Sequence, residues 1–86
     1  MIINYTTGGL KHAAKKHHID KKRIERALAS KIYAIAKDTV NNSTIIFTED
    51  IAVVVDNYKC LKSAFPYSKR YYKNKTRNTE NLLNIK

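Results

Sequence analysis

The apolar residues of this 86-residue chain change their spacing near residue 31, and this change constrains the fold strongly. Before it, apolar residues recur at i, i+3 and i+4, as on one face of an α-helix. After it, they gather in short runs rich in β-branched residues, as in strands. Because helices and strands occupy separate halves, we expect one α+β domain over residues 1–86, with two N-terminal helices packed on a three- to four-stranded antiparallel sheet.

Two short helices are expected in the first half, after an extended start at residues 2–5. The first spans residues 10–18 and the second spans 21–30. Asp20, which lies between them, is a favoured N-cap residue for the second helix. The apolar residues that repeat at helical spacing are Leu10, Ala13 and Ala14, then Ile24, Ala27 and Leu28. The remaining face of the second helix carries Lys and Arg, which suit phosphates better than bases.

Strands are expected over residues 32–39, 43–48, 51–55 and 60–65, separated by Asn- and Asp-containing turn signals. Residues 51–55 are continuously apolar, which is typical of a central strand covered on both faces, so Val53 and Val55 should be buried. Pro66 should end the last strand. The second sheet face is expected to be partly open to a ligand. A basic, aromatic tail begins at about residue 67, and residues 79–85 favour a short terminal helix.

The net charge of +10 indicates a polyanionic partner. Basic residues concentrate in residues 1–31 and 67–86, whereas residues 32–66 are near neutral. No apolar run approaches the roughly 20 residues of a spanning helix, so no membrane-spanning segment is expected. No signal peptide is visible, and Cys60, the single cysteine, excludes an internal disulfide. These features favour a reducing, cytoplasmic site of action.

All three histidines lie within residues 12–18, among lysines. Histidine is the residue type whose ordinary pKa, about 6.5, allows proton exchange near neutral pH. Cations around it suit chemistry on a phosphate. The histidines lack a third ligand at metal-binding spacing, so no metal site and no cofactor are expected.

Three segments resemble small bacterial toxins related to BrnT. Residues 12–19 are similar to the opening helix of those toxins, which has a His-Ala pair, basic residues and then Ile. Residues 51–56 are similar to their central strand, and 61–66 to their last strand. Lys16 stands where Arg is common and Ser63 where Thr is common, and the tail beyond Arg70 is longer than in the family.

The resemblance implies a wider group of metal-independent ribonuclease toxins that includes RelE and the colicin D nuclease. It implies cleavage of mRNA or tRNA and an acidic antitoxin or immunity protein as partner. It also implies either a free-standing toxin or the C-terminal domain of a larger secreted toxin.

Metal-free RNA cleavage needs a base for the 2′-hydroxyl, an acid for the leaving 5′-oxygen and cations for the phosphate. His12 is the expected acid/base, and Lys16, one helical turn later, should stabilise charge on phosphorus. Ser63 should position the phosphate, and Arg70 should clamp it in bidentate fashion. The tyrosines could stack on unpaired bases. The residues expected to contact RNA are Lys11, Lys15, His17, Arg23, Tyr67, Lys69 and Tyr71.

Two other classes of protein remain open at this point. One is a basic nucleic-acid-binding module without catalysis, and the other is a structural protein associated with the ribosome. The clustered histidines favour the ribonuclease.

Overall fold

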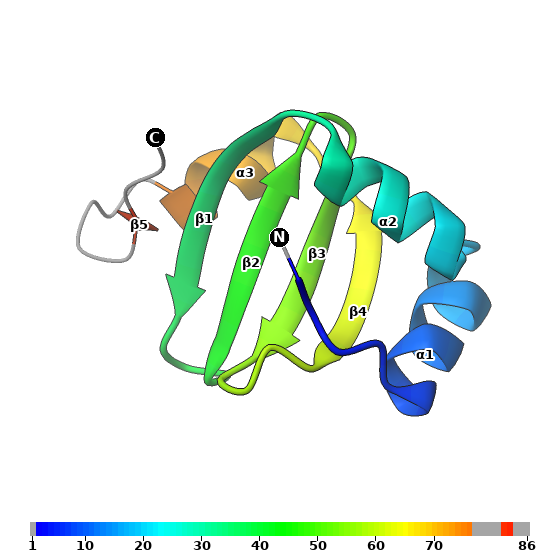
Figure 1. The fold of residues 1–86 in the computed structure, drawn as a ribbon. Coiled ribbons are helices and arrows are strands. Elements are labelled where there is room, and N and C mark those ends of the chain that lie inside the picture. The colour runs from blue at the N-terminus through cyan, green and yellow to red at the C-terminus, as the bar shows by residue number, and fades with distance from the viewer. Residues whose placement is uncertain (1, 77–81, 84–86) are drawn as a thin grey trace.

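The computed structural model describes residues 2–76 and the backbone of Leu82–Leu83. The elements are α1 (Thr7–His17), α2 (Lys21–Ala29), β1 (Ile32–Asp38), β2 (Ser43–Thr48), β3 (Ile51–Asp56), β4 (Leu61–Pro66), α3 (Lys69–Thr76) and β5 (Leu82–Leu83). They form one antiparallel sheet in the order β4-β3-β2-β1-β5 (Figure 1). The expected α+β fold, with two helices before the sheet, is confirmed.

The start of α1 is determined by Thr6. Its Oγ1 accepts the N–H of Gly9 at 3.0 Å and donates to the carbonyl oxygen of Leu61 in β4 at 2.8 Å. The helix therefore begins at Thr7, earlier than predicted, and includes the glycine pair. A Cβ on Gly9 would lie 2.1 Å from the Leu61 oxygen, so glycine allows α1 to approach β4 closely.

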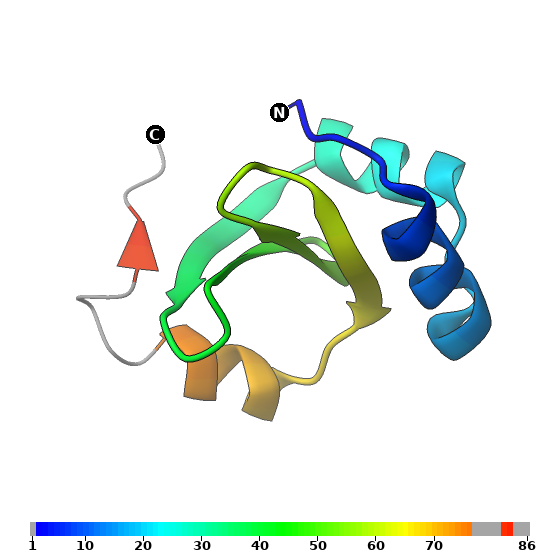
Figure 2. The same cartoon turned by 90° about the horizontal axis from the view of Figure 1, so that it is seen from below.

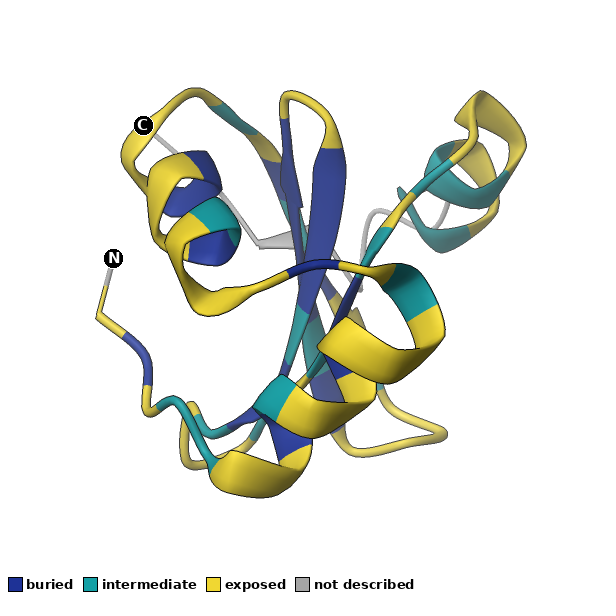
Figure 3. Ribbon diagram, turned by 90° about the vertical axis from the view of Figure 1, so that its right-hand side faces the viewer, coloured by how far each residue is buried: buried dark blue, intermediate teal, exposed yellow. Residues whose placement is uncertain are grey.

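The second helix follows the prediction. The Asp20 Oδ1 accepts the N–H of Arg23 at 2.8 Å, as an N-cap does. Ile24, Ala27 and Leu28 are buried in the core on one sheet face. In Figure 3, α1 and α2 turn exposed residues outward and buried residues toward the strands.

The sheet separates two apolar clusters because side chains alternate along each strand. Ile46 belongs to the cluster under α2, whereas Ile45 and Phe47 belong to the cluster on the opposite face. Val53 and Val55 are 0% and 3% exposed, as predicted for the central strand β3.

The sequence identified the tail after Pro66 only as basic and aromatic, and its residues 69–76 form α3. The Ser68 Oγ accepts the N–H of Tyr71 at 3.1 Å at the start of this helix. Tyr67, Tyr71 and Tyr72 all pack on Phe47, at ring-centroid distances of 5.0, 5.9 and 5.0 Å. Aromatic anchoring therefore holds α3 on the second sheet face, opposite α2 and the N-terminal segment (Figure 2).

The prediction of a terminal helix over residues 79–85 is wrong at Leu82–Leu83. These residues are extended and pair with Ile35 and Ala36 of β1. Pairing with the open edge of β1 satisfies backbone groups that a helix would leave unpaired there. The rest of that segment lies outside the described residues. No helix in the described part of the chain is long and apolar enough to cross a membrane.

Candidate functional site

A hollow of about 570 Å³ opens on the α3 face of the sheet. Residues from α1, the strands, the β1–β2 turn and α3 line it. Its apolar floor is Ile45, Val54 and Phe65. Its polar lining is His12, His17, Asp38, Asn41, Ser43, Lys62, Ser63, Tyr71 and Lys75. Groups far apart in the sequence thus converge on one concave surface.

Two histidines of α1 reach this hollow. The ring centroids of His12 and His17 are 6.0 Å apart. His12 is exposed and His17 is half-buried, with its ring centroid 5.4 Å from that of Phe65. The hollow therefore holds two neighbouring imidazoles, of which one rests on the sheet.

A β-bulge in β4 turns two adjacent polar residues toward the hollow. Val54 pairs with Ser63 and Val55 pairs with Leu61, so Lys62 is an extra residue in the strand. The Lys62 Nζ donates to the Oγ of Ser43 at 2.9 Å and to the carbonyl oxygen of Asn41 at 3.3 Å. Among residues 2–76, Lys62 forms no ion pair, so its charge is not neutralised there.

Ser63 has an unusual environment for a hydroxyl. Its Oγ is buried and has no hydrogen-bond partner among the described residues. A buried polar atom without a partner is destabilising, commonly by about 1–3 kcal/mol. In a hollow that also contains Lys62, such a group suits a bound acceptor, for example a phosphate oxygen.

A second lysine reaches the hollow from α3. The Lys75 Nζ lies 3.4 Å from the Asp38 Oδ2 and 5.7 Å from the centroid of the Tyr71 ring. The Asn41 side chain donates to the same carboxylate oxygen at 2.9 Å. The hydrogen bond from Asn41, aided by the charge of Lys75, holds the pKa of Asp38 below its ordinary value. Burial, together with the charge of Asp38, raises the pKa of Tyr71.

The structure brings together part of the site predicted from sequence. His12, His17, Ser63 and Tyr71 line the hollow. Lys16 and Arg70 are exposed and do not line it, and the same holds for Lys11 and Lys15. Arg23 pairs with Asp50, and Tyr67 and Lys69 line a separate pocket. The predicted catalytic set is therefore divided between the hollow and the outer surface.

Five polar groups of the hollow were missed in the sequence: Asp38, Asn41, Ser43, Lys62 and Lys75. Lys62 directly precedes the predicted Ser63, but side chains of neighbouring residues in a regular strand point to opposite faces. Lys62 was therefore not expected beside Ser63, and the β-bulge is what places both residues in the hollow. Lys75 belongs to the tail for which no regular structure was predicted, so its position on a helix was not foreseen.

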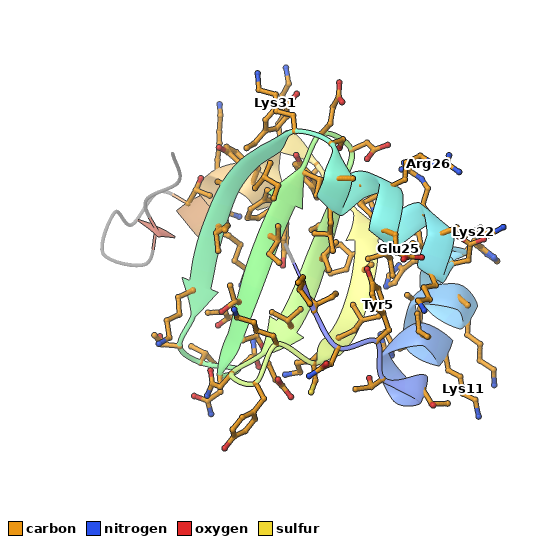
Figure 4. The ribbon with its side chains drawn as sticks, in the orientation of Figure 1. Tyr5, Lys11, Lys22, Glu25, Arg26 and Lys31 are labelled. Carbon is orange, nitrogen blue, oxygen red and sulfur yellow. The ribbon has the colours of Figure 1, made fainter. Side chains whose placement is uncertain are left out.

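The outer surface of α1 and α2 is strongly basic. Lys11, Lys22 and Arg26 point away from the sheet in Figure 4, and Lys31 lies at the top of that view. Lys15, Lys16 and Lys21 are also exposed on these helices. This outer helical surface can attract a polyanion but lacks the aromatic and histidine groups of the hollow.

Comparison with known protein families, with curated protein sequences and with solved structures finds no match. Function is therefore inferred from the groups that the fold brings together.

Proposed function

We propose that this chain is a ribonuclease that cleaves RNA without a metal ion, by attack of the 2′-hydroxyl on the neighbouring phosphate. One observation supports this most. Two imidazoles, two lysines and a buried serine hydroxyl without a partner share one hollow. This set supplies each kind of group that the reaction requires.

The reaction needs proton transfer at both ends of the phosphate. One imidazole takes the proton of the 2′-hydroxyl while the 2′-oxygen forms its bond to phosphorus. The other gives a proton to the 5′-oxygen as its bond to phosphorus breaks. The products are a 2′,3′-cyclic phosphate and a free 5′-hydroxyl. His12 and His17, with rings 6.0 Å apart, are close enough to share one phosphate.

The remaining groups act on charge and position. Lys62 and Lys75 stabilise the negative charge that builds up on the phosphate oxygens. The Ser63 hydroxyl donates to one of those oxygens, which gives it the partner that it lacks. The Tyr71 ring, beside Phe65 at 5.4 Å, offers an aromatic surface to an unpaired base.

We further propose that the protein acts as a toxin, neutralised by an acidic antitoxin or immunity protein. The support is the net charge of +10 and the exposed lysines and arginines of the outer helical surface. The same surface would also serve a nucleic-acid-binding module without catalysis, which is the second candidate function.

The test is cleavage of a fluorogenic oligoribonucleotide in EDTA. His12→Ala and His17→Ala are each expected to lower the rate about 10²- to 10⁴-fold. His18→Asn is the matched control, because His18 caps α1 at φ 57° and does not line the hollow. Asparagine tolerates that backbone conformation, so the control should cleave normally.

Two further readouts separate the candidate functions. The wild-type products should carry cyclic phosphate ends, and a 2′-deoxy substrate should not be cut. Full activity in His12→Ala and His17→Ala, or a need for a divalent metal, contradicts the proposal. Tight RNA binding with no cleavage by the wild type favours the non-catalytic module.

A further inference from the structure

A second pocket, of about 310 Å³, lies near the start of α3. Three tyrosines line it: Tyr33 from β1, Tyr67 from the β4–α3 link and Tyr72 from α3. The other lining residues are Glu49, Asp50 and Lys69. Aromatic walls with a few polar groups are typical of a site for a planar ligand.

Two of the aromatic walls are held firmly. The rings of Tyr67 and Tyr72 lie 6.1 Å apart at 27° to each other, and both meet Phe47 edge-on. The Tyr67 hydroxyl also donates to the carbonyl oxygen of Thr48. Tyr33, by contrast, is 46% exposed, so its ring is available to a ligand.

The polar groups of the pocket differ in availability. Asp50 is paired with Arg23, but Glu49 is exposed and forms no ion pair among residues 2–76. Glu49 therefore offers an acceptor to N–H donors. Lys69 in the pocket and Lys31, whose Nζ lies 5.6 Å from the Tyr33 ring centroid, offer positive charge to a phosphate.

We propose that this pocket binds a nucleobase of the RNA and that the base it prefers is guanine. The proposal rests on the proposed ribonuclease function for the identity of the ligand. The Watson–Crick edge of guanine presents adjacent N1–H and N2–H donors, which match the two oxygens of the Glu49 carboxylate. Adenine, cytosine and uracil do not present two adjacent donors on this edge. Each has a donor next to an acceptor atom, and the carboxylate repels that acceptor.

The pocket lies within reach of the hollow. Tyr71 lines the hollow and Tyr72 lines the pocket, and these consecutive residues of α3 both contact Phe47. One strand of RNA can therefore place a phosphate in the hollow and a nearby base against Tyr33. A cationic ligand fits the aromatic walls less well, because Lys31 and Lys69 would repel it.

The test measures binding of short 2′-deoxy oligonucleotides by fluorescence anisotropy, because the proposed reaction cannot cut them. An oligonucleotide with one guanine is expected to bind about tenfold or more tightly than its adenine counterpart. Hypoxanthine, which lacks the N2 amino group, should lose much of that advantage. Glu49→Gln should abolish the preference, and Tyr33→Ala should weaken binding of every base.

Matched controls are Glu25→Gln on α2 and Tyr58→Ala, whose side chain is 83% exposed away from the pocket. Both should keep the wild-type preference for guanine over adenine. Equal binding of guanine and adenine by the wild type, or an unchanged preference in Glu49→Gln, overturns the inference. Cleavage without base preference rejects only the guanine site, and guanine preference without cleavage of RNA rejects only the ribonuclease.

Discussion

Gly8 and Gly9 are neighbours in the first turn of α1, yet their surroundings differ. Nothing lies within 4 Å of a Cβ built on Gly8, whereas a Cβ on Gly9 meets the backbone of Leu61. Backbone atoms of a strand that is hydrogen-bonded in the sheet cannot move away as a flexible side chain can. This contact allows α1 to lie close to β4 and so helps to set the position of His12 and His17.

We therefore expect Gly9→Ala to lower the free energy of unfolding by about 1–3 kcal/mol, as overpacking does. Gly8→Ala should raise it slightly, because alanine loses less backbone entropy in a helix than glycine. Urea unfolding followed by circular dichroism measures both variants. Equal stability of the two variants would show that α1 can shift away from β4.

Lys62 and Lys16 provide a second comparison between single residues. Only Lys62 lines the hollow, although the sequence pattern favours Lys16. Lys62→Met should lower the cleavage rate about 10²- to 10³-fold, the range for loss of a transition-state donor. Lys16→Met removes the same charge and should have a much smaller effect. A larger effect at Lys16, measured with the same oligoribonucleotide, would favour the assignment made from sequence.

At the scale of elements, Asp38 links the end of β1 to α3. It accepts hydrogen bonds from Asn41 in the β1–β2 turn and pairs with Lys75 of α3. Its pKa is lowered in the folded protein, mainly by the Asn41 side chain. A lowered carboxyl pKa contributes stability that is present above the ordinary value, about 3.9, and is lost as pH falls through the folded value.

Between pH 6 and strongly acidic pH, the wild type should therefore lose more stability than Asp38→Asn, because only the wild type has this carboxylate to protonate. Urea midpoints at a series of pH values test this. Glu25→Gln, exposed on α2, is the control and should keep the wild-type acid sensitivity. Parallel pH profiles for Asp38→Asn and the wild type would contradict a stabilising role for this carboxylate.

At the scale of the whole molecule, charge is separated between the outer helical surface and the near-neutral strands. The logarithm of the affinity for RNA should fall linearly with the logarithm of the salt concentration, because phosphates that bind the protein release counterions. Lys22→Glu, on the outer helical surface, should reduce that slope by about 1. Lys37→Glu changes the net charge by the same amount, but Lys37 lies in β1. The slope measured for this variant should therefore stay nearer that of the wild type.

Filter-binding titrations at several salt concentrations compare the three proteins. Equal slopes for all three would exclude contact of RNA with α2.

Local pattern determined the elements that have a regular period. The apolar spacing predicted α2 almost to the residue, and β-branched runs predicted β2 and β3, because helix and strand geometry repeat over a few neighbouring residues. Asp20 was identified as an N-cap for the same reason. The tail escaped prediction because α3 is held by contacts of its tyrosines with Phe47, a residue distant in sequence.

The candidate site depended on tertiary structure to a much greater extent. The sequence was sufficient to predict that His12 and His17 share one helix and that the chain is strongly basic. It was not sufficient to predict which lysines line the hollow together with these histidines. The bulge in β4 turns Lys62 beside Ser63, and the docking of α3 carries Lys75 to Asp38. These side-chain contacts depend on strand register and on packing between residues that are distant in sequence. The apolar spacing of a short segment carries no information about either.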